Sequence, residues 1–156
     1  QMDEFKFRFV TKDCIALFGK IPANTVGNWG KMNGQQMVEH VTDFFYVAAN
    51  KIYYPLVTPE EHLTKYKAFL LSDKEFRENT KAPTSIIGEE PLPLRDATME
   101  LALENLNKSI IAFENYFSDN ADKKTMHPVF GELNYEEWVL LHYKHVRHHL
   151  KQFGLL

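Results

Sequence analysis

The chain contains seven histidines, and four of them lie close together near the C-terminus: His142, His145, His148 and His149. On a helix, residues four positions apart lie on the same face, one turn apart, so His145 and His149 can direct two imidazoles at one metal ion. Neutral imidazole is a common ligand of zinc and other transition-metal ions. The spacing therefore predicts a metal site on the inner face of a C-terminal helix.

A third imidazole comes from an earlier segment of the chain. His40 lies beside Met37 and Phe44 in a stretch with helical spacing, so we expect it to face the core with them. Two imidazoles from one helix and one from a facing helix form a three-histidine site that leaves coordination positions for water or substrate. A divalent ion bound there would lower the pKa of a bound water or activate a bound thiol. Three nitrogen ligands suit zinc or nickel, among other ions.

The other histidines have different interpretations. His148 falls on the polar side of the helical wheel, so we expect a solvated surface imidazole. His142 faces inward, as a ligand, a neighbour of the ligands or a packed core residue. Trp29 and His127 each precede the start of a ligand-bearing helix, so both are candidates for lining a pocket beside the metal. The alternative for all of these inward residues is ordinary core packing.

Other reactive groups have weaker support. The carboxylates of Glu39, Glu100 and Glu104 are able to act as acid or base, but most such groups are solvated surface charges. Cys14 is the only cysteine, so the chain offers neither a disulfide nor a thiolate pair for a metal. The glycines lack the spacing of a phosphate-binding loop. Catalytic residues therefore stay unassigned.

Length and composition narrow the class of protein. The chain has 156 residues, of which 44% are apolar, and this predicts one domain over 1–156 with its own core. A formal net charge of −3 argues against nucleic-acid partners and anionic membrane surfaces. Apolar runs are far shorter than the roughly 20 residues that span a bilayer, and no export signal is visible. With a single cysteine, these features favour a soluble protein in the reducing cytoplasm.

Helical periodicity dominates between the prolines and glycines. We expect helices over 11–20, 34–53, 58–71 and 95–118, and a last helix that begins at 135. Capping boxes at Asn33 and Asn134 predict the starts of two of them, and Thr58 is the expected N-cap of another. Residues 5–9 alternate like a short strand but have no partner strand, so we expect an extended N-terminal arm over 1–10 that packs on the helices.

These elements predict a fold class. Three long amphipathic helices, shorter ones and no credible sheet favour an all-α protein, most economically an antiparallel four-helix bundle. The segment 72–94 contains three prolines and shows no sustained period. We expect it to form a long crossover connection between two helices of the bundle.

Several short motifs resemble a known family. They are W-G-K-M at 29–32 followed by Q-M at 36–37 and His40, K-A-P-T at 81–84, H-P-V-F-G at 127–131, and H-x-x-H-H-x-x-Q at 145–152. Together they are similar to a bacterial family known only as a domain of unknown function, which resembles the DinB/YfiT-like superfamily. The similarity extends from about residue 12 to residue 154.

The resemblance implies a four-helix bundle that holds a divalent metal through one histidine of an early helix and two of the last helix. At the matching positions these are His40, His145 and His149. Some members of the superfamily are transferases or isomerases that use low-molecular-weight thiols such as bacillithiol or mycothiol, and others resemble metal-dependent hydrolases. The reaction rests on analogy between folds.

Two functions remain open from the sequence. The first is an enzyme in which the metal activates a small thiol or a water for reaction with an unknown small molecule. The alternative is a non-catalytic helical bundle that acts by binding, sensing or oligomerisation, with a vestigial or structural metal site. The sequence leaves monomer and homodimer open.

Overall fold

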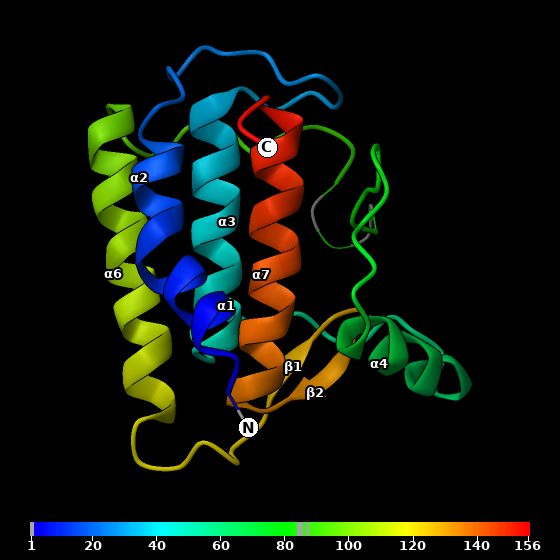
Figure 1. Ribbon diagram of the computed structural model, residues 1–156. Helices are drawn as coiled ribbons and strands as arrows, with labels where there is room; N and C mark the ends of the chain where they lie inside the picture. The colour runs from blue at the N-terminus through cyan, green and yellow to red at the C-terminus, as the bar shows by residue number, and fades with distance from the viewer. Residues whose placement is uncertain (1, 84–85, 87) are drawn as a thin grey trace.

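The computed structural model describes residues 2–83, 86 and 88–156, and this part of the chain is mostly helical (Figure 1). Residue 84 of the K-A-P-T motif and residues 85 and 87 of the expected crossover lie outside the described residues. The α-helices are α1 (Glu4–Arg8), α2 (Cys14–Phe18), α3 (Gly34–Ala48), α4 (Leu63–Leu71), α6 (Met99–Phe117) and α7 (Tyr135–Gln152). A π-helical turn, Phe9–Asp13, joins α1 to α2, and a 3-10 turn, Glu60–His62, precedes α4. The expectation of a mainly helical protein is confirmed.

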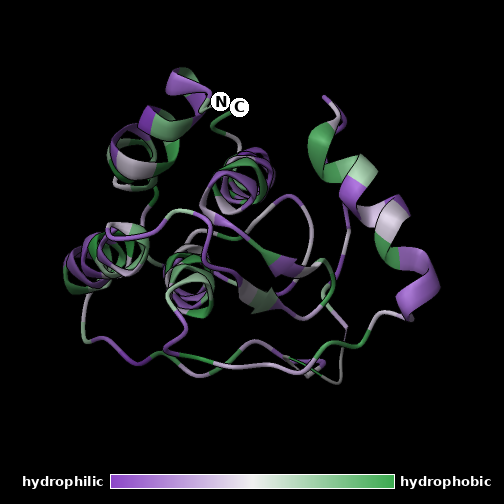
Figure 2. Cartoon of the chain, turned by 90° about the horizontal axis from the view of Figure 1, so that it is seen from below, coloured by the Kyte–Doolittle hydropathy of each residue, from purple (hydrophilic) through white to green (hydrophobic). Residues whose placement is uncertain are grey.

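The helices form one packed group with a single outlier. Helices α2, α3, α6 and α7 run side by side, with α3 between α6 and α7, whereas α4 stands to one side of them (Figures 1 and 2). The chain returns from α4 to α6 through a long segment with little regular structure. That segment passes near the ends of α3 and α7, which gives it a part in the site described below.

The N-terminus differs from the expected extended arm because residues 4–8 form α1. The Asp3 side chain accepts a hydrogen bond from the Lys6 backbone N–H at 3.1 Å and caps this helix. Phe5 and Phe9, four residues apart, stack on each other and each meets the edge of Tyr143. The apolar spacing that resembled a strand is thus also compatible with a helix packed on α7.

Both predicted capping boxes are confirmed. The Asn33 side chain accepts from Gln36 N–H at 2.8 Å, and the Gln36 side chain accepts from Asn33 N–H at 2.9 Å. Asn134 and Glu137 repeat the arrangement at the start of α7, at 2.9 and 3.0 Å. These local bonds fix where the two histidine-bearing helices begin, and therefore the register of their inner faces.

Three other helix boundaries differ from expectation. Helix α3 ends at Ala48 rather than near 53, since Asn50 adopts a left-handed conformation with φ of 60°. Thr58 does not cap α4, which begins only at Leu63 after the 3-10 turn, and its hydroxyl instead donates to the Val129 carbonyl. Helix α6 begins at Met99 instead of 95, with the Thr98 side chain as its cap.

A small sheet corrects the expectation that none exists. Strands β1 (Thr125–His127) and β2 (Gly131–Leu133) pair antiparallel, with Thr125 opposite Leu133 and His127 opposite Gly131. Three-residue strands are too short to show a period of two in the sequence. The hairpin is held against the helices because Thr125 Oγ1 donates to the Ala48 carbonyl at 2.8 Å and accepts from Trp138 Nε1 at 2.7 Å.

The core lies between α3, α6 and α7, and α6 contributes an apolar seam to it. Leu106, Ile110, Phe113 and Phe117 are buried, and they pack in a cluster with residues of α3 and α7. Within the described part of the chain, no helix combines the length and the apolar character needed to cross a membrane.

Candidate metal centre

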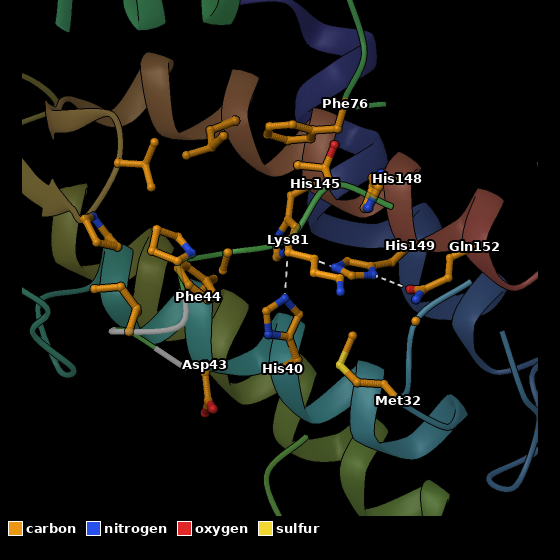
Figure 3. Close-up of a pocket in the computed structure, with 18 of the residues that line it drawn as sticks. Met32, His40, Asp43, Phe44, Phe76, Lys81, His145, His148, His149 and Gln152 are labelled. Carbon is orange, nitrogen blue, oxygen red and sulfur yellow. Dashed lines mark hydrogen bonds between the residues drawn. The ribbon is translucent and has the colours of Figure 1, made fainter. Parts of the chain in front are cut away.

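Three imidazoles from α3 and α7 face one another at the wall of a cavity (Figure 3). His145 Nε2 lies 3.0 Å from His40 Nε2 and 3.0 Å from His149 Nε2. One ligand nitrogen from each of the three side chains lies within 4.8 Å of the others. The structure thus brings together the three histidines predicted as ligands, and among the described residues this is the group suited to a metal ion.

Gln152 sets the tautomer of His149. The Gln152 side-chain N–H donates to the Trp29 carbonyl at 2.9 Å, so its amide oxygen faces His149 Nδ1 at 2.7 Å. Nδ1 therefore carries the proton that Gln152 accepts, and Nε2 of the same ring presents a lone pair toward His145. This is the tautomer that a metal-binding histidine adopts when its other nitrogen donates to a neighbouring group.

A shared cation satisfies the three facing nitrogens better than hydrogen bonds between them can. A proton on His145 Nε2 can point at only one of its two neighbours, and a proton on His40 Nε2 leaves the lone pairs of His145 and His149 opposed. A cation between the three nitrogens satisfies all of them. A separation of 3.0 Å also suits two imidazole nitrogens that bind one ion at about 2.0–2.1 Å.

Burial keeps these imidazoles neutral. Removal from water lowers the pKa of His40 to about 4, with a smaller contribution from His148. Burial also holds the pKa of His145 and of His149 well below the ordinary value of 6.5, and the neighbouring histidines add to this effect. Because a metal binds the neutral ring, the ligand form is the one that the fold favours.

The triad opens onto a cavity of about 1150 Å³. The predicted pocket residues Trp29, His127 and His142 all line it. Aromatic side chains from separate parts of the chain make much of the remaining wall, namely Phe44, Tyr54, Tyr66, Phe69, Phe76 and Phe130. A small molecule with an apolar body therefore has room beside the three imidazoles.

His142 lines the cavity but is not part of the triad. Its ring stacks on Phe45 with centroids 3.9 Å apart, and it also stacks on Trp138. Its Nε2 is enclosed and has no hydrogen-bond partner among the described residues. The structure thus places His142 as a packed core residue beside the cavity, which is one of its three predicted roles.

His148 corrects the expectation of a solvated imidazole, because it is only 8% exposed. Its ring lies 5.4 Å from the Trp29 ring and 5.8 Å from Phe76, between centroids. The segment after α4 covers this side of α7, where Lys144 Nζ donates to the Ser72 carbonyl at 2.7 Å and Arg147 pairs with Glu75. A helical wheel of α7 alone could not predict the burial of His148, because the residues that cover it come from a distant segment of the chain.

An ion-pair cluster beside His40, formed by two buried carboxylates and the half-exposed Arg95, was also missed. Glu39, expected to be solvated, is buried and accepts from Arg95 N–H at 2.9 Å. Arg95 also donates to Asp43 at 2.7 Å, and the Asp43 side chain points away from the triad (Figure 3). The available signal in the sequence was the four-residue spacing of Glu39 and Asp43, which places two carboxylates on one face of the helix that carries His40. The cluster ties the end of the long connection to α3.

The remaining candidates do not reach the site. Glu100 and Glu104 are exposed on α6, as expected of most carboxylates. Cys14 is fully buried and donates to the Val10 carbonyl. Burial raises the pKa of the Cys14 thiol to about 12, so the reactive thiolate is disfavoured.

The role of Gln152 in orienting His149 gives a measurable expectation. We expect Gln152→Ala to lower the affinity for zinc by about 10- to 100-fold, because His149 loses the acceptor that fixes its tautomer and orientation. Competition with a chromophoric chelator measures this affinity. Lys151→Ala, in the same turn of α7, is the control and should leave it unchanged. Equal zinc affinity for Gln152→Ala and the wild type would contradict this role.

The buried neutral histidines outside the triad predict acid sensitivity. Burial lowers the pKa of His127 and of His142 to about 3, from an ordinary value of 6.5. As the pH falls below 6.5, protons therefore bind the unfolded chain first, and the free energy of unfolding decreases down to about pH 3. We expect the urea midpoint of the metal-free protein to be lower at pH 5.5 than at pH 7.5. Identical midpoints would contradict the burial of two uncharged imidazoles.

Comparison with known proteins gives one match. A family model described as "Protein of unknown function (DUF1569)" matches residues 55–154. The matched range contains the hairpin and α7 with His145 and His149, whereas His40 precedes it. No curated protein matches the chain, and neither does any solved structure.

Proposed function

The chain belongs to this family of unknown function, and we propose that it binds one divalent metal ion through His40, His145 and His149. The observation that carries the proposal is the meeting of the three Nε2 atoms, which protons alone cannot satisfy. Zinc and nickel are among the ions that three imidazoles suit.

The proposal extends to the fold family. The side-by-side arrangement of α2, α3, α6 and α7 supports a four-helix bundle of the DinB/YfiT-like kind (Figure 1). Helix α7 runs antiparallel to α3, whereas α3 and α6 run in the same direction, as the long connection between α4 and α6 allows (Figure 1). In bundles of helices, metal sites are built from side chains on facing helices. The candidate ligands follow this pattern, because His40 lies on α3 whereas His145 and His149 lie on α7.

For activity, we propose a metal-dependent thiol transferase or hydrolase that acts on a small molecule. A bound divalent ion supplies a Lewis acid that stabilises a thiolate or hydroxide at neutral pH. The chain contributes the rest: Gln152 orients His149, and the cavity offers the reactant an aromatic wall beside the triad. Three protein ligands leave coordination positions for that reactant.

Cobalt substitution tests whether the site is open. We expect the visible spectrum of the cobalt-loaded protein to change on addition of 2-mercaptoethanol or imidazole, because either ligand can enter a free coordination position. Trp29→Ala should alter the affinity for these ligands without removing cobalt. A spectrum indifferent to both ligands would exclude an open metal site.

The second candidate is a non-catalytic bundle in which the metal is structural or sensed. It is favoured by the carboxylates on the same helix as His40, because Arg95 pairs with both Glu39 and Asp43 and neither is free to act as a base. In that case the cobalt spectrum stays unchanged by added ligands, and zinc raises the unfolding temperature without giving activity with any thiol or ester.

A further inference from the structure

The cavity wall also contains His127, a histidine outside the triad that lies at the end of β1. His127 Nδ1 accepts hydrogen bonds from two backbone N–H groups of the hairpin turn, Val129 at 3.0 Å and Phe130 at 3.2 Å. A ring nitrogen that accepts these bonds cannot carry a proton. The neutral ring therefore holds its proton on Nε2, and that tautomer is set by the backbone.

The turn that fixes His127 is itself held by bonds to another segment. Val57 N–H donates to the Pro128 carbonyl at 2.8 Å, and the Thr58 hydroxyl donates to the Val129 carbonyl at 2.7 Å. Around the imidazole, the rings of Phe44, Phe130 and Trp138 lie with centroids 5.2 to 5.6 Å away. Both the tautomer and the direction of the ring are thus determined by the fold.

The proton on His127 Nε2 has no acceptor in the described part of the protein. Only 9% of the residue is exposed, yet it borders the cavity, and Nε2 is not among the fully enclosed polar atoms without a partner. Burial also keeps the ring uncharged, because it lowers the pKa of His127 to about 3. An N–H donor whose tautomer and direction are preset can bind an acceptor atom of a molecule in the cavity without reorganisation of the ring.

We propose that His127 Nε2–H is a preset hydrogen-bond donor for the ligand of the cavity, and that this ligand carries a carbonyl oxygen on an apolar body. The aromatic residues of the wall receive the body, and His127 receives the oxygen. No metal ion is needed for this contact, so it stands or falls separately from the metal proposal.

Two variants separate the donor from the structural role of His127. In His127→Asn, the side-chain oxygen can accept from the turn N–H groups as Nδ1 does, in the manner of an Asx turn, but no Nε2–H remains. His127→Ala loses both the donor and the acceptor. We expect the urea midpoint of His127→Asn to stay closer to that of the wild type than the midpoint of His127→Ala.

The binding test uses the full chain, in chelator and again with zinc, and two probes of similar size. The probes are 4-phenyl-2-butanone, which has a carbonyl oxygen, and butylbenzene, which has none. We expect His127→Asn to weaken ketone binding by about 2- to 10-fold, the range of one neutral hydrogen bond, and to leave butylbenzene binding unchanged. Equal weakening for both probes, or no saturable binding of the ketone to the wild type, would overturn the proposal.

A second readout does not depend on any variant. In protein labelled with ¹⁵N-histidine, the His127 ring should show the Nε2–H tautomer at neutral pH, and the ketone should shift its Nε2–H resonance whereas butylbenzene should not. A Nδ1–H tautomer, or an unmoved Nε2–H resonance in the ketone-saturated protein, would exclude His127 as the donor.

Discussion

Replacing His145 with alanine is expected to lower the affinity of the protein for zinc by about 100-fold or more. His145 is the middle ligand, since its Nε2 lies 3.0 Å from the Nε2 atoms of both His40 and His149. Without it, only two imidazoles on different helices remain, and two nitrogen ligands hold a divalent ion poorly. Metal content after dialysis and competition with a chelator measure the loss.

The control for this variant is His148→Ala, which removes a neighbouring buried imidazole from the same helix. His148 contacts Trp29 and Phe76 but does not belong to the triad, so zinc affinity should stay near that of the wild type. Far-ultraviolet circular dichroism confirms that both variants fold. If His145→Ala and His148→Ala bind zinc equally, the assignment of the ligands is wrong.

Leu106→Ala is expected to lower the free energy of unfolding by about 2–5 kcal/mol. Leu106 lies in the middle of the α6 seam and is fully buried in the core. Truncation removes several buried methyl and methylene groups and leaves a cavity that the packed helices fill only in part. Urea denaturation of the metal-free protein measures the change without a contribution from bound ligand.

Leu101→Ala is the matched control on the same helix. Leu101 is 38% exposed, so its truncation should cost much less than that of Leu106. Equal losses at the two positions would mean that α6 does not present its seam to α3 and α7 as described.

The candidate ligands could be predicted because their positions depend on local sequence. The capping box at Asn134 fixes the register of α7, and the four-residue spacing then places His145 and His149 on one face. The box at Asn33 does the same for His40 on α3.

The features that were missed depend on contacts between distant segments. His148 is buried because the segment after α4 covers α7, and Arg95 meets Glu39 across 56 positions of the chain. The alternation of residues 5–9 predicted an extended arm, whereas the Asp3 cap and the packing on Tyr143 stabilise a helix over residues 4–8. The locked tautomer of His127 depends on a hairpin whose strands are too short to have a readable period.

The most direct test of the metal proposal is an anomalous difference map from a crystal of the zinc-loaded protein, measured on both sides of the zinc absorption edge. We expect one peak between His40, His145 and His149, about 2.0–2.1 Å from each Nε2. Absence of a peak there, or a peak bound by other residues, would contradict the assignment of these three histidines as a metal site.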